Sequence, residues 1–190
     1  WFDGNDSVGE WRQETHSIQA AVHNDSAGLA QAAMELAAAP DGRILNEAIY
    51  AWRITLGTGA PRQLLEPLTS TTRPPEVRAF GHVSLAWLEL VEGRLDPARR
   101  ELARAAALDS VTAIEHGALM LLFPFVPATT AELTAMREQV ARWKPDPRPN
   151  SAASRLGGVH DDAHLVLRDY LLGGLSARLG DGAEAERRAA

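Results

Sequence analysis

Two histidines four residues apart are the side chains of this sequence whose spacing most suggests chemistry. The segment His160-Asp161-Asp162-Ala163-His164 would place both imidazoles on one face of a helix, where they could share a metal ion. A zinc protease needs Glu directly after the first histidine, but Asp161 stands there, and the sequence identifies no third ligand. We therefore interpret the segment as a polar helix start, where Asp161 and Asp162 interact favourably with the helix dipole. A metal-dependent enzyme or metal-binding protein using His160 and His164 remains the alternative.

The rest of the sequence offers little for catalysis. His116 follows Glu115 in an apolar helical stretch, where a lone histidine is typical of packing or hydrogen bonding. There is no cysteine, which excludes thiolate chemistry and cysteine-based metal sites. Nucleophile elbows, phosphate loops and dinucleotide fingerprints are also missing from the sequence. We predict a protein that is not an enzyme and that holds no cofactor or metal.

Charge and hydropathy exclude two further classes. The formal net charge is −6, whereas a general nucleic-acid binder needs a basic face, so we expect no nucleic-acid partner. The longest apolar run, 117–128, contains two prolines and is too short to span a bilayer. We slightly favour a cytoplasmic over a periplasmic location. Because the chain starts at Trp1 and stops inside an expected helix at Ala190, we also expect it to be a piece of a longer protein.

The elements that must position these residues are predicted to be helices. The 190 residues are rich in Ala, Leu, Arg and Glu, which favour helices, and apolar residues recur at helical spacing between turn residues. The expected helices are 7–24, 27–39, 43–56, 61–70, 75–91, 98–108, 111–123, 129–143, 160–179 and 183 onward. We expect Asp25 to begin a helix, Pro67 to shorten one, Asp96 to act as an N-cap, and Thr129 with Glu132 to form a capping box.

These helices fall into pairs with a faint repeat. Segments that open near Asp25, Gly59, Gly93 and Pro127 begin at steps of 34 residues, a period typical of stacked helical repeats. Prolines at 145, 147 and 149 interrupt the spacing, because a helix interior cannot accommodate them. We predict helical repeats over 1–144, a Pro/Gly-rich loop over 145–159, and a final, truncated repeat over 160–190.

One segment, Phe80 to Asp109, resembles a tetratricopeptide repeat. Small residues that let two helices approach stand at the expected places, as do the large apolar positions and the turn glycine. The matching residues are Leu85, Ala86, Gly93, Ala98, Leu102 and Ala105. The segment from Asp169 to Ala190 resembles the same repeat at four positions, namely Leu172, Gly173, Gly180 and Ala185. Composition also resembles the repeat regions of long bacterial signalling proteins.

The resemblance implies an all-α, right-handed superhelix of about five antiparallel helix pairs, a tetratricopeptide-like solenoid. The first helix of each pair would line a concave groove that binds a partner protein or other subunits of a complex. On that face we expect partner-binding residues of the types that anchor interfaces, namely Tyr50, Arg53, Trp87 and Tyr170. The alternative role for each of these residues is packing in the core. Chaperone-binding members of the family bind a peptide carboxylate with polar and basic residues on this face. Those residues are missing here, since Val83, Ser84 and Trp87 stand at the matching positions.

The function expected from the sequence is therefore a non-catalytic scaffold or adaptor for protein–protein interaction. Besides the metal-dependent alternative, a ligand-sensing regulatory module of a larger signalling protein stays open. That module would have a closed small-molecule pocket among Trp52, Trp87 and Phe123.

Overall fold

The computed structural model describes residues 16–36, 51, 57–144 and 163–189. These residues form helices joined by turns, with no strand among them, so the predicted all-α class is confirmed for this part of the chain. The chain divides into two compact units, residues 1–101 and 102–190. The predicted loop over 145–159 lies outside the described residues, so the predicted domain boundaries stay a prediction.

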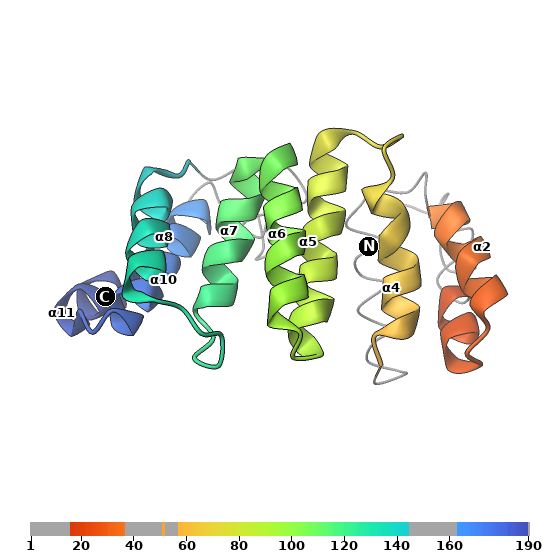
Figure 1. The fold of residues 1–190 in the computed structure, drawn as a ribbon, viewed down its shortest axis with the longest axis horizontal. Helices are drawn as coiled ribbons and strands as arrows, with labels where there is room; N and C mark the ends of the chain where they lie inside the picture. Colours follow the sequence, from red (N-terminus) through yellow and green to blue (C-terminus); the bar gives the residue numbers. More distant parts are fainter. Residues whose placement is uncertain (1–15, 37–50, 52–56, 145–162, 190) are drawn as a thin grey trace, which may run out of the picture. The chain divides into compact units, whose positions relative to one another are not determined.

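The described part of the first unit consists of helices (Figure 1). They are a helix over residues 16–22, α2 (Ser26–Leu36), α4 (Gly59–Leu65), the 3-10 helix η1 (Glu66–Thr69), α5 (Pro75–Val91) and the start of α6 (Leu95–Leu108), which continues into the second unit. The long helix predicted to start at Pro74-Pro75 and to run to about Val91 is confirmed as α5.

Local sequence explains where these helices begin and end. Asp25 begins α2 as predicted, since its Oδ1 accepts hydrogen bonds from the amides of Ala27 and Gly28 at 3.1 and 3.0 Å. Pro67 shortens its helix as predicted, because its ring nitrogen cannot donate, and the α-helix gives way to η1. The N-cap predicted at Asp96 is wrong: the chain is already helical at Leu95, so Asp96 lies in the first turn of α6.

The core of the first unit is built from leucines and alanines of α2, α4, η1 and α5. Its largest buried members include Leu29, Leu64, Leu68 and Phe80. η1 lies directly against the α5 backbone because position 81 has no side chain. A Cβ added at Gly81 would stand 2.7 Å from the Leu68 Cβ and 3.1 Å from the Leu68 carbonyl carbon.

The described part of the second unit contains α7 (Ser110–Leu121), α8 (Thr130–Arg142), α10 (Ala163–Arg178) and α11 (Gly182–Ala189), besides the rest of α6. Asp109 caps α7 through the Val111 amide at 3.1 Å. The capping box predicted at Thr129 and Glu132 is confirmed, with the two reciprocal bonds at 3.1 and 2.7 Å.

The core of the second unit lies between α7, α8 and α10. Leu167, Leu171 and Leu175 recur every four residues along one face of α10 and are at most 2% exposed. They pack with Val140 and Trp143 from the end of α8, which are also buried. The buried face of α10 is therefore a continuous stripe of leucines.

Some positions that carried the family resemblance are buried. Ala86 and Ala105 are 0% exposed and Ala98 is 3% exposed, as small residues at close helix contacts should be. Burial of small residues is common to all closely packed helices, so the superhelix itself stays a prediction. None of the described helices has the length and apolarity needed to cross a bilayer.

Candidate functional site

The four predicted partner-binding residues fall in different parts of the chain. Tyr50 and Arg53 lie outside the described residues. Trp87 is partly buried on α5 in the first unit, and Tyr170 is 61% exposed on α10 in the second unit. Tyr170 is therefore accessible to a partner. Trp52 also lies outside the described residues, so the alternative pocket with Trp87 and Phe123 stays untested.

Of the two histidines considered as metal ligands, the structure describes one. His160 lies outside the described residues, and His164 occupies the first turn of α10. Within the described ranges, no group of three or more His, Asp or Glu side chains is placed to hold a metal ion. His116 and Glu115 are both buried in α7, with the His116 Nε2 3.7 Å from Glu115 Oε1.

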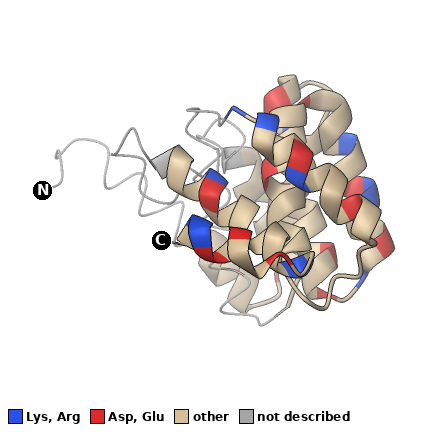
Figure 2. Cartoon of the chain, turned by 90° about the vertical axis from the view of Figure 1, so that its left-hand side faces the viewer, with Lys and Arg blue, Asp and Glu red and all other residues tan. Residues whose placement is uncertain are grey.

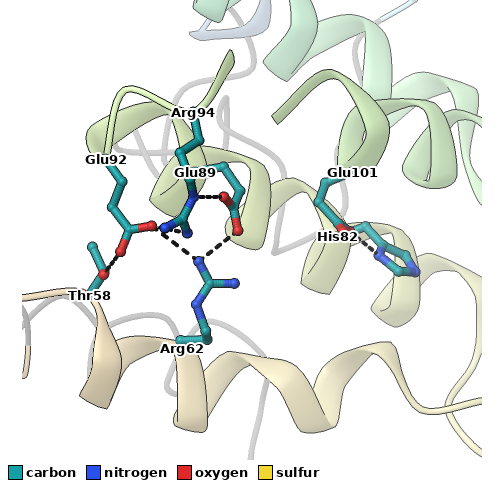
Figure 3. A network of polar contacts seen from close by, with 7 residues as sticks. All are labelled: Thr58, Arg62, His82, Glu89, Glu92, Arg94 and Glu101. Atoms are coloured by element: carbon teal, nitrogen blue, oxygen red, sulfur yellow. Dashed lines mark hydrogen bonds and ion pairs between the residues drawn. The ribbon is translucent and has the colours of Figure 1, made fainter. Parts of the chain in front are cut away.

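A network of charged side chains joins α4 to the end of α5, and sequence reasoning missed its centre, Glu89 (Figure 3). The Glu89 side chain is only 9% exposed. Its Oε1 accepts a hydrogen bond from Arg62 Nη2 at 2.7 Å, and its Oε2 accepts one from Arg94 Nε at 2.5 Å. Glu92 pairs with both arginines and accepts a bond from the Thr58 hydroxyl.

This arrangement sets the charge of Glu89. Burial by itself raises the pKa of a carboxyl group, because it disfavours the charged form. The hydrogen bonds from Arg94 and Arg62, together with their positive charges, outweigh burial and hold the pKa of Glu89 below its ordinary value of 4.5. Glu89 is therefore an ionised carboxylate at neutral pH with a partner on each oxygen.

The network is suited to holding helices together and not to catalysis. Two arginines face two glutamates, so the charges cancel, and both oxygens of the buried carboxylate are engaged. A second polar contact links α5 to α6, where His82 Nδ1 lies 2.8 Å from Glu101 Oε2 and both side chains are about one-seventh exposed. Such contacts fix helix positions without offering a free group to a substrate.

The signal that could have identified Glu89 is its place in an apolar helix. It stands between Leu88 and Leu90, both buried, so any helix register that buries this stretch brings a carboxylate to the interior. A buried carboxylate requires a cationic partner. The partner Arg62 is 27 residues away in the sequence and belongs to another helix, and periodicity cannot identify it.

The outer face of α10 presents a different chemistry, with three apolar or aromatic side chains in contact with solvent. Leu165 is 46% exposed, Val166 is 68% exposed and Tyr170 is 61% exposed. Val166 and Tyr170 are four residues apart and therefore lie on the same helix face. We call these three residues the α10 surface. It lies on a helix whose other face is held by the leucine stripe.

The C-terminal end of α10 is fixed by Arg178. Its Nη1 donates to the carbonyl oxygens of Leu121, Phe123 and Val126 at 2.6, 3.1 and 3.0 Å. These carbonyls belong to the end of α7 and the following loop, so one guanidinium ties the loop to the end of α10. Phe123 and Phe125 of this loop are 40% and 62% exposed, with ring centroids 5.3 Å apart.

Both signs of charge occur along the described helices. Viewed from the side of α10 and α11, basic and acidic segments alternate (Figure 2). Within the second unit, Arg188 pairs at 2.6 Å with Asp169, which precedes Tyr170 in the sequence.

The chain was compared with protein-family models, with curated proteins and with solved structures, and none of the three comparisons finds a match.

Proposed function

We propose that this protein is a non-catalytic scaffold that binds a partner protein chain, and that the α10 surface is part of the contact. The observation that carries the proposal is the pair of exposed side chains Val166 and Tyr170 on one face of α10. The opposite face of the same helix is anchored in the core by Leu167, Leu171 and Leu175. A partner would therefore meet a helix that is already ordered, which limits the entropy lost on binding.

The chemistry of the α10 surface fits a protein partner better than a small substrate. Tyr offers a large rigid ring with a polar tip and is a residue type that dominates interface energetics. Val166 and Leu165 extend the apolar area, and the Asp169–Arg188 ion pair supplies polar groups beside them. We expect the partner to present an apolar face of a helix or an extended segment, with polar groups around it.

The proposal includes the tetratricopeptide-like superhelix of about five helix pairs. The all-helical described residues support it, and the burial of Ala86, Ala98 and Ala105 fits the close helix contacts that it requires. In such a repeat architecture neighbouring helix pairs stack and leave surfaces free for other chains. The bacterial and cytoplasmic setting expected from the sequence belongs to the same proposal.

The test begins by identifying the partner and continues with purified components. Cross-linking mass spectrometry on native extract would name proteins cross-linked to residues of α10. The dissociation constant of the purified complex would then be measured for the wild type, Tyr170→Ala and Val166→Asp. We expect each substitution to weaken binding by about tenfold or more, as truncation of an interface anchor does.

Met34 provides the matched control, because it is a 71% exposed apolar residue on α2 in the first unit. The Met34→Asp variant should bind the partner as the wild type does. The proposal is wrong if Tyr170→Ala and Val166→Asp leave the dissociation constant unchanged while their circular dichroism spectra match that of the wild type. Equal weakening by Met34→Asp would also count against it, since the effect would not be specific to α10.

A further inference from the structure

An open groove of about 320 Å³ lies between the helix over residues 16–22 and α2. One row of wall side chains comes from the first helix and the turn that follows it, and the other row comes from the start of α2, including the residue that caps it. The first row consists of His16, Gln19 and His23, and the second row contains Asp25 and Gln31, with Ala20 and Gly28 also lining the groove. Both rows are polar, and the groove belongs entirely to the first unit. Its volume is at the small end of the range found for small-molecule sites.

Gly28 allows the two walls to stand this close. A Cβ at position 28 would lie 3.0 Å from the Ala20 Cβ, which is closer than side chains normally approach. It would also lie 2.7 Å from Asp25 Oδ2. The missing side chain therefore brings the helices together and leaves the Asp25 carboxylate at the wall of the groove.

The charge of the groove comes from Asp25. With histidine counted as neutral, it is the one formal charge among the described lining residues. Oδ1 already accepts the amides of Ala27 and Gly28, so these two amides at the start of α2 are not available to an anion. Oδ2 accepts no hydrogen bond from the described part of the chain, and one carboxylate oxygen stays available to a donor.

A metal ion is a poor occupant of this groove. His16 begins the first helix and His23 lies in the turn directly after it, seven residues later, which separates them by about 10 Å along the helix axis. The described residues contain no group of three metal-binding side chains. The remaining lining groups are carboxamides and imidazoles, which serve hydrogen-bonded ligands.

We infer that this groove binds the guanidinium or ammonium group of a cationic ligand. Asp25 Oδ2 would accept a charge-assisted hydrogen bond from the cation, and Gln19 would supply a neutral acceptor beside it. The net charge of −6 favours the approach of a cation over that of an anion. The cation could belong to a free small molecule or to an arginine side chain of another protein. The inference is independent of the α10 surface, which lies in the other unit.

The test is an NMR titration of the full chain with two probes. Agmatine represents the free small molecule, and a blocked Gly-Arg-Gly peptide represents the arginine of a protein. We expect saturable shifts of amides in 16–31 with at least one probe. Binding of agmatine identifies a small-molecule site, and binding of the peptide alone identifies a site for a partner's arginine. Failure of both probes to bind overturns the inference.

The decisive variant is Asp25→Asn, because asparagine caps a helix about as well as aspartate but carries no charge. It should keep α2 folded and weaken binding by about tenfold. Asp181→Asn is the matched control, since Asp181 Oδ1 also accepts a bond from a helix-start amide, that of Glu184 at 3.2 Å. It should bind like the wild type. Unchanged binding in Asp25→Asn overturns the inference.

If Asp25→Asn unfolds, a second variant gives the answer. Gln19 is exposed, so Gln19→Lys should fold, and its ammonium group would occupy or repel the cation site. We expect the saturable shifts to disappear in this variant. If Gln19→Lys binds either probe as tightly as the wild type does, the inference is wrong.

Discussion

The helices α5 and α10 are similar in length, with 17 and 16 residues. Each holds side chains in an environment that disfavours them, but the two environments are opposite. α5 buries the carboxylate of Glu89, and α10 exposes Val166 and Tyr170 to water. The cost on α5 is offset within the first unit, since Arg62 and Arg94 bind both oxygens of the carboxylate. On α10 the apolar side chains stay in contact with water, so the cost of exposing them is not offset.

This difference separates structural from binding features. A buried charge without partners would prevent folding, so the fold must contain its compensation. An exposed aromatic side chain costs little in the free protein and becomes favourable when another molecule covers it. Glu89 therefore serves the fold, whereas the α10 surface is the place at which we propose that a partner binds.

The largest expected effect contrasts the two faces of α10. Leu171 is 0% exposed, so Leu171→Ala should lower the free energy of unfolding by about 2–5 kcal/mol. Tyr170→Ala, one residue away on the exposed face, should change it by at most about 0.5 kcal/mol. Urea denaturation followed by circular dichroism measures both. Similar losses in the two variants would show that Tyr170 is part of the core.

The next effect concerns the buried carboxylate of α5. Glu89→Gln keeps the shape of the side chain but loses the charge that both arginines face, and we expect a loss of about 1.5–3 kcal/mol at pH 7. The control is Glu138→Gln on α8, where the side chain is exposed and the change should stay within about 0.5 kcal/mol. If both variants cost the same, the network does not stabilise the fold.

The same variant makes a prediction about pH. The pKa of Glu89 is lower in the folded chain than its ordinary value of 4.5, so ionisation stabilises the folded state. This contribution is complete above that ordinary value and is lost as the pH falls through the lowered pKa. The stability difference between wild type and Glu89→Gln should therefore shrink as the pH is lowered from 6 toward 3. A difference that stays constant over this range would contradict the lowered pKa.

The smallest expected effect is at the end of α10. Arg178→Ala removes the donor shared by three carbonyl oxygens, and we expect a loss of about 1–3 kcal/mol. Hydrogen exchange should rise at the amides of residues 122–128, because the loop loses its attachment. Arg142→Ala, an exposed residue in the last turn of α8, should leave those amides protected. Unchanged exchange in Arg178→Ala would mean that the loop is held by its own packing.

Local signals in the sequence predicted much of the described fold. Pro75 at a helix start, Pro67 at a helix end and the Thr129–Glu132 capping box act through neighbours in the chain, and each is found as predicted. Apolar spacing also identified the helical class. The Asp96 N-cap failed because the turn at Gly93, with a φ of 74°, lets the helix begin earlier than the sequence signal suggests.

The candidate site could be predicted only in part. The sequence singled out Tyr170 by residue type and register, and its exposure makes it available for binding. It gave no reason to select Val166, because exposed and buried apolar residues look alike within α10. The contacts of Arg62 with Glu89 and of Arg178 with Leu121 span 27 and 57 residues. Such pairings are decided by tertiary packing between distant segments, so local sequence patterns do not indicate them.

The contact at Gly81 has a consequence for how this chain can evolve. Because a new Cβ at position 81 would meet the Cβ of Leu68, trimming Leu68 to alanine would leave the obstruction in place. No exchange of side chains beyond Cβ at position 68 can therefore compensate for the loss of this glycine. Lineages that descend from this sequence should retain the glycine at position 81 for as long as η1 packs against the α5 backbone.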